Sequence, residues 1–116
     1  MTERDYSDYL QDIFDSIIAL EEFVSGMKFK DFKNDKKTLF AVTRCFEIIG
    51  EATMKISRTI RNKYPDVAWN EMAGMRDKLI HEYFGVDVKV LWRTIKKDIP
   101  PLKTALSKVV QDLKSQ

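Results

Sequence analysis

The residues best suited to chemistry lie in one octet in the second half of the chain. Positions 76 to 83 read Arg-Asp-Lys-Leu-Ile-His-Glu-Tyr and include the only histidine among the 116 residues. A histidine exchanges protons near neutral pH, an arginine carries a permanent charge that binds phosphate, and a tyrosine offers a hydroxyl for modification. This combination indicates chemistry on a phosphodiester.

The spacing within the octet limits how one helix can use it. At about 100° per residue, the side chains of Arg76 and His81 point roughly 140° apart, whereas Asp77 and His81 share a side. A two-fold dimer could still bring Arg76 and His81 of two chains around one groove. We therefore take Asp77 as a supporting residue that positions the imidazole, with a solvent-facing or capping role as its alternative.

The sequence around the octet extends the pattern over nearly the whole chain. The flanking segments read Trp69-Asn-Glu-Met-Ala-Gly-Met75 and Phe84-Gly-Val-Asp87, with Glu47-Ile-Ile-Gly-Glu-Ala52 upstream and both Leu91-Trp92 and Asp98-Ile-Pro100 downstream. From about Tyr6 to the C-terminal helix, the chain resembles the HepT family of HEPN-domain toxins. The family's Arg-x4-His-x-Tyr signature is intact.

The resemblance implies a fold, an activity and two partners. HepT-like proteins are small, all-helical, homodimeric ribonucleases, encoded beside an MntA-type minimal nucleotidyltransferase antitoxin. In the family, the motif arginine and histidine cleave RNA, and the antitoxin silences the toxin by AMPylation of the motif tyrosine. The resemblance thus assigns catalysis to Arg76 and His81 and the modification to Tyr83.

The chemistry that we expect is metal-independent cleavage through the 2′-hydroxyl of the RNA, with no cofactor. His81 would act as the general base, or as the acid toward the leaving oxygen, and Arg76 would bind the scissile phosphate. The alternative for the whole protein is a non-catalytic HEPN binding subunit that docks a nucleotidyltransferase or a nucleotide. For single residues, the alternatives are a partly buried structural His81 and an Arg76 that forms a salt bridge.

Two groups of basic residues are candidates for RNA binding, because clustered cations attract phosphates. Their alternative is a solvated helix face. One group precedes the octet and the other follows it: Lys55, Arg58, Arg61, Lys63; Lys89, Arg93, Lys96, Lys97.

Composition and length predict one domain, residues 1–116, that stays in the cytoplasm. The chain is 44% hydrophobic and 33% charged, as in globular proteins, and its polar N-terminus lacks a leader pattern. No apolar run approaches the ~20 residues of a membrane span. Cys45 is expected to be a core thiol, and the pair Glu47 and Glu51 lacks the Glu-x-x-His partner of a di-metal bundle, so no metal is expected.

Apolar residues at three-and-four spacing predict an all-α, antiparallel bundle of about five helices. The first should end near Gly26, and the second should run from Asn34 or Asp35 to Tyr64, near 27 residues and roughly 40 Å. Within it, Gly50 would allow a close approach of helices in the core or at a dimer contact.

The remaining helices carry the octet and the C-terminus. The third should start near Trp69 or Asn70 and reach Tyr83, and Asp87 should cap the fourth. Pro100-Pro101 should then interrupt or kink the chain before a fifth helix.

Overall fold

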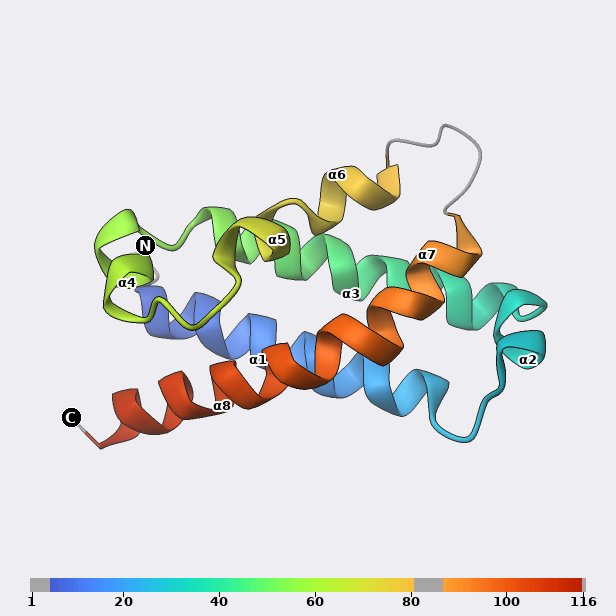
Figure 1. Cartoon of the computed structure of the whole chain (residues 1–116), viewed down its shortest axis with the longest axis horizontal. Helices are drawn as coiled ribbons and strands as arrows, with labels where there is room; N and C mark the ends of the chain where they lie inside the picture. The colour runs from blue at the N-terminus through green and yellow to red at the C-terminus, as the bar shows by residue number, and fades with distance from the viewer. Residues whose placement is uncertain (1–4, 81–86, 116) are drawn as a thin grey trace.

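The protein is a bundle of antiparallel helical passes, seen here in a computed structural model that describes residues 5–80 and 87–115, with residues 78–80 as backbone only (Figure 1). Helix α1 (Tyr6–Val24) runs along the long axis, and α3 (Lys36–Met54) returns beside it. The chain runs forward again through α5 (Trp69–Ala73) and α6 (Met75–Ile80), and back through α7 (Val88–Arg93) and α8 (Ile99–Lys114). The described residues contain no strand, so the all-α prediction is confirmed.

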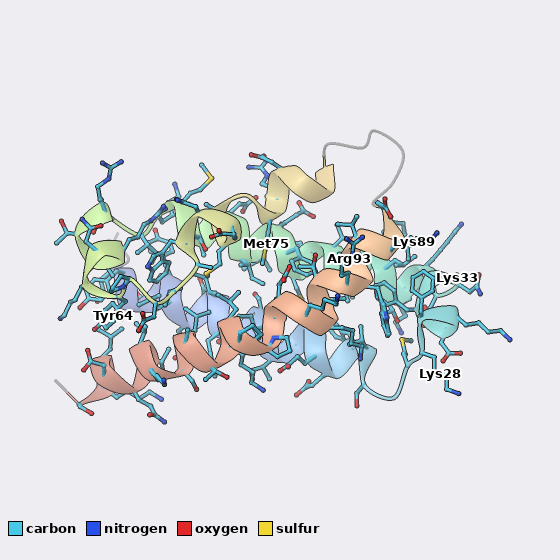
Figure 2. All side chains as sticks on the ribbon, viewed as in Figure 1. Lys28, Lys33, Tyr64, Met75, Lys89 and Arg93 are labelled. Carbon is cyan, nitrogen blue, oxygen red and sulfur yellow. The ribbon has the colours of Figure 1, made fainter. Side chains whose placement is uncertain are left out.

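The core follows the apolar spacing of the long helices. Leu10, Ile13 and Ile17 are fully buried on α1, and they face buried residues of α3 such as Phe46. Met75 and neighbouring side chains extend the core to the second half of the bundle (Figure 2). The molecule measures 44 × 28 × 28 Å along its principal axes. Of the described helices, none is long and apolar enough to cross a membrane.

Short polar side chains set where the helices begin. The carboxylate of Asp35 accepts the N–H of Thr38 at 3.2 Å, and that of Asp87 accepts the N–H of Lys89 at 3.0 Å. Both predicted caps are therefore confirmed. At the other end of α1, Gly26 has a φ of 77°, a left-handed conformation that glycine adopts without steric cost, in agreement with the predicted stop.

The expected 27-residue helix is wrong, because the chain breaks after Met54. Helix α3 has 19 residues, and a separate α4 (Arg58–Lys63) follows. The hydroxyl of Ser57 accepts the N–H of Ile60 at 3.3 Å and starts α4 anew. An N-cap serine in the middle of an apolar pattern thus outweighs the periodicity.

The third predicted helix also consists of two pieces. Helix α5 begins at Trp69, as expected, but it ends at Ala73, and α6 starts after Gly74. The predicted end at Tyr83 lies outside the described residues. A short helix that the apolar spacing did not indicate, α2 (Phe29–Lys33), precedes α3 and buries Phe32.

The two prolines do not interrupt the last helical pass. A π-helical turn, η1 (Thr94–Asp98), joins α7 to α8, and the N–H of Ile99 donates to the carbonyl of Thr94. Pro100 and Pro101 fall in the first turn of α8, where a missing N–H costs no helical hydrogen bond. The expected interruption is therefore replaced by a change of helical type.

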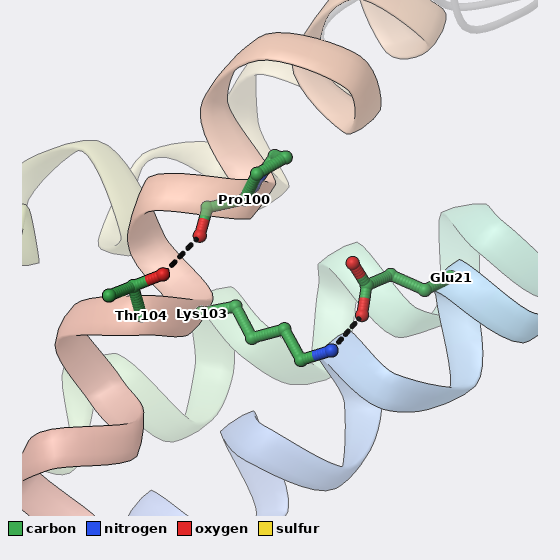
Figure 3. A network of polar contacts seen from close by, with 4 residues as sticks. All are labelled: Glu21, Pro100, Lys103 and Thr104. Atoms are coloured by element: carbon green, nitrogen blue, oxygen red, sulfur yellow. Dashed lines mark hydrogen bonds and ion pairs between the residues drawn. The ribbon is translucent and has the colours of Figure 1, made fainter.

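Contacts downstream of the prolines fasten α8 in place (Figure 3). The hydroxyl of Thr104 donates to the carbonyl of Pro100 at 3.2 Å, and Lys103 forms a 2.8 Å ion pair with Glu21 of α1. Because both charged side chains are partly solvent-exposed, the ion pair contributes at most about 1 kcal/mol.

Candidate active site

The position of the motif helix is set by one glycine on its neighbour. Gly50 is buried on α3, and a Cβ atom there would lie 2.9 Å from the Cβ and 3.2 Å from the backbone N of Arg76. Only a residue without a side chain lets α6 come this close. The predicted close approach at Gly50 is therefore confirmed, and it is Arg76 that approaches.

Arg76 projects from this contact toward solvent. Its side chain is exposed, and among the described residues no carboxylate lies within ion-pair distance of its guanidinium. The alternative of a salt bridge across the bundle thus finds no support in the described part of the chain. A permanently charged group without a protein partner is available to an external anion.

The other residues of the motif divide into one that is described and two that are not. Asp77 is exposed on α6, next to Arg76 in the sequence. His81 and Tyr83 lie outside the described residues, directly after the end of α6 at Ile80. The roles predicted for them remain predictions.

The two predicted basic groups lie at opposite ends of the long axis. Helix α4, which carries three of the first group, is at one end, and α7, from which Lys89 and Arg93 project, is near the other (Figures 1 and 2). Helix α6 lies between them and ends on the side of α7. The two groups therefore cannot form one continuous patch.

Within the first group, Arg61 has a structural role. Its Nε donates to the carbonyl of Ile56 at 3.1 Å, and its guanidinium Nη2 donates to that of Thr53 at 2.7 Å. These carbonyls belong to the end of α3 and the turn after it, where backbone acceptors have no helical partner. Lys55, Arg58 and Lys63 are exposed, as a phosphate contact would require.

The second group has neighbours that we did not identify from the sequence. Lys28 and Lys33 flank α2, and Figure 2 shows them at the same end of the molecule as Lys89 and Arg93. The ring of Phe29 on α2 meets that of Trp92 on α7, with centroids 6.1 Å apart. The signal that could have revealed them is the run Lys-Phe-Lys-Asp-Phe-Lys at positions 28–33.

Three other groups serve the fold rather than the site. Burial raises the pKa of the Cys45 thiol, as for an inert core cysteine. The hydroxyl of Tyr64 donates to a carboxylate oxygen of Asp112 at 2.5 Å, and this bond raises the pKa of Tyr64 to about 12. The indole N–H of Trp69 donates to the carbonyl of Tyr64 at 2.9 Å.

Comparison with known proteins decides the family. The model of the family described as "Ribonuclease HepT-like" matches residues 13–109. The chain belongs to this family. Over 107 residues, this HepT-like chain is 53% identical to "Probable ribonuclease HepT" of Thermococcus cleftensis, covering 92% of the chain and 97% of the relative.

Further relatives match this HepT-like chain over its full length. Two proteins of Methanocaldococcus jannaschii, each named "Putative RNase", are 43% and 44% identical over 116 residues and are covered to 96% and 100%. No solved structure matches significantly. The HEPN kind of ribonuclease that the motif indicated is thus shown by family, while Arg76 is the motif residue with described geometry.

Proposed function

We propose that the protein is the toxin of a HepT/MntA-type toxin–antitoxin system and cleaves RNA internally without a metal ion. The observation that carries the proposal is the Arg76 guanidinium, which is exposed, without an ion-pair partner among the described residues, and held by the contact of α6 with Gly50. Family membership supports RNA as the substrate.

The proposed reaction uses the RNA as its own nucleophile. His81 accepts the proton of the 2′-hydroxyl while that oxygen attacks the adjacent phosphorus, and the bond to the 5′ oxygen of the next nucleotide breaks. The leaving oxygen takes a proton from a protonated imidazole or from water. Arg76 stabilises the negative charge that grows on the phosphoryl oxygens, and the products are a 2′,3′-cyclic phosphate and a 5′-hydroxyl.

We further propose that two copies of the chain complete the site by pairing their α3 helices. Large apolar side chains are exposed at both ends of one face of α3, Phe40 at 73% and Met54 at 64%. Arg44 and Glu51 lie between them on the same face. Exposed apolar groups at matched distances from a helix centre are typical of a two-fold contact.

An antiparallel pairing centred between Glu47 and Ile48 makes this face self-complementary. Phe40 then lies near the partner subunit's Met54, and Arg44 lies opposite the partner subunit's Glu51. Because Gly50 is in contact with Arg76, this arrangement would bring Arg76 of both subunits beside the same interface. A shared groove would overcome the angular separation of Arg76 and His81 along one chain.

Regulation in this proposal acts at Tyr83. An MntA-type nucleotidyltransferase of the same cytoplasm would add AMP to the hydroxyl. The modification places bulk and negative charge two residues from His81, where an RNA phosphate must bind, so steric exclusion and like-charge repulsion would block the substrate.

The test is cleavage of a mixed RNA pool by the purified protein in EDTA, beside His81→Ala and Arg76→Ala prepared in the same way. Product ends are identified by mass spectrometry. We expect 2′,3′-cyclic phosphate ends with the native protein and a loss of cleavage of at least about 100-fold in both variants, typical for a proton-transfer group or a charge-stabilising donor.

One result would move the assignment to the other candidate. If native protein whose intact mass shows no AMP leaves the RNA uncut, the non-catalytic HEPN subunit that docks a nucleotidyltransferase or a nucleotide becomes the better reading. Cleavage that requires a divalent metal would reject the mechanism but retain the ribonuclease.

A further inference from the structure

One end of the bundle combines cations and aromatic rings that no step of the proposed reaction uses. The surface is formed by α2 and α7, which pack against each other. We call it the α2–α7 surface and define it by six residues: Lys28, Phe29, Lys33, Lys89, Trp92, Arg93.

The aromatic part of this surface is open to a planar ligand. Trp92 is partly exposed and packs on Phe32, with ring centroids 4.9 Å apart. The ammonium of Lys96 lies over the Trp92 ring, 4.6 Å from its centroid. An exposed, flexible lysine, rather than core atoms, thus covers a ring face, and a stacked nucleobase gains more from that face than an exposed cation does.

The two tryptophans differ in their polar contacts. The indole N–H of Trp69 donates to two backbone carbonyls, those of Arg61 and Tyr64. That of Trp92 has no acceptor among the residues that the structure describes. A partly exposed indole with a spare donor is suited to a polar aromatic ligand rather than to the core alone.

The cations of the surface are not neutralised by nearby acids. Asp31, Asp35 and Asp87 lie in the same segments, but their carboxylates accept backbone N–H groups at the starts of α2, α3 and α7. Within the described ranges, no ion pair involves Lys28, Lys33, Lys89 or Arg93. The positive charge therefore remains available to phosphates.

We propose that the α2–α7 surface binds single-stranded RNA, with a base stacked on Trp92 and the flanking phosphates bound by Lys28, Lys33, Lys89 and Arg93. Cations beside exposed rings are the arrangement that single strands require, whereas a duplex hides its base faces. This inference rests on the proposed ribonuclease function and deepens it, because it places the substrate strand outside the cleavage motif.

The surface is close enough to the motif helix for one strand to reach both. Ile80 at the end of α6 and Asp87 before α7 are seven residues apart, which limits their separation to about 25 Å. At roughly 3.4 Å per stacked nucleotide, such a distance corresponds to about seven nucleotides. A short strand held on the α2–α7 surface would thus extend to Arg76.

The first test measures binding apart from cleavage. A fluorescent 2′-O-methyl RNA of twelve nucleotides, which lacks the attacking hydroxyl, is titrated with the native protein and with Lys28→Glu/Lys33→Glu, and anisotropy is read at several salt concentrations. We expect the double variant to bind about tenfold more weakly at low salt, with a salt dependence reduced by roughly 1.4 log units per log unit, for two lost phosphate contacts on a single strand.

The matched control is Lys108→Glu/Lys114→Glu. It makes the same change in net charge at two exposed lysines of α8, and the affinity should change less than twofold. Equal weakening in both double variants would mean that only overall charge matters and would overturn the assignment of the surface.

The second test addresses stacking. Trp92→Leu is titrated with the same oligonucleotide and with one of equal length without bases. We expect the native protein to prefer the strand with bases by about tenfold and Trp92→Leu to lose this preference, with its fold checked by circular dichroism. If Trp92→Leu does not fold, the native preference is checked by quenching of tryptophan emission on addition of the strand with bases; an absence of quenching would reject stacking.

Failure of this inference is distinct from failure of the proposed function. If the native protein cleaves RNA and the Lys28/Lys33 variant binds and cleaves equally well, the surface is rejected and the ribonuclease stands; the surface would then be left to a protein partner. If the native protein cleaves no RNA, the proposed function fails, and the binding curves still decide whether the surface holds a strand.

Discussion

Two arginines of the chain use the same functional group for opposite purposes. The guanidinium of Arg61 satisfies the carbonyls of Thr53 and Ile56, whereas that of Arg76 is exposed with no ion-pair partner among the described residues. A guanidinium bonded to carbonyls at a helix end stabilises the fold, and an unpaired one is free to bind an anion. The contrast makes Arg76 the stronger candidate for contact with substrate.

At the same scale, Tyr83→Phe separates catalysis from regulation. The substitution removes the hydroxyl that would accept AMP but keeps the ring, so the variant should cleave RNA within about threefold of the native rate and resist silencing. Cleavage is measured after incubation with the MntA-type enzyme and ATP, and intact mass reports AMP on the native protein. A Phe variant that the enzyme still silences would contradict the assignment of Tyr83.

At the scale of elements, the contact between α3 and α6 determines where Arg76 stands. Gly50→Ala puts a methyl group 2.9 Å from the Cβ of Arg76, so α6 must move away. We expect a loss of about 1–3 kcal/mol in the free energy of unfolding, the usual range for overpacking, partly offset by better helix propensity. Cleavage should fall at least about tenfold, since a small misplacement of a catalytic group is costly.

The control for this prediction is Gly74→Ala, between α5 and α6. A Cβ there meets the carbonyl oxygen of Asn70 at 3.4 Å, an ordinary contact, and the backbone has an α conformation. Thermal unfolding and cleavage should both stay close to native. Equal effects in the two variants would show that the close packing of α6 at Gly50 is not what positions Arg76.

At the scale of the whole molecule, the proposed dimer predicts that the exposed face of α3 controls both assembly and activity. Phe40→Asp places a charge in the proposed apolar contact, so the variant should be monomeric at concentrations where the native protein is dimeric, with cleavage reduced at least about tenfold. Light scattering on size-exclusion chromatography gives the mass.

Phe23→Asp serves as the control, because Phe23 is also an exposed aromatic side chain, at 43%, but lies on α1. It should remain dimeric and active. A native protein that is monomeric yet active, or a Phe40 variant that is still a dimer, would contradict pairing through α3.

The sequence by itself determined the fold class, the first helix and two helix starts. Apolar residues at helical spacing predict buried faces because burial of apolar area is local to each helix, and the caps at Asp35 and Asp87 depend on residues within one turn. The Arg-x4-His-x-Tyr motif and its flanks also indicated the family. These features need no knowledge of how the helices pack.

The tertiary structure decided what depends on distant residues. The break after Met54 is stabilised by Arg61, and the π-helical turn accommodates the prolines, so neither follows from periodicity. The packing of α2 against α7 joins lysines and rings that are about sixty residues apart in the sequence. Spacing along a chain reports which face a residue shares, whereas packing between helices decides which residues of other segments it meets.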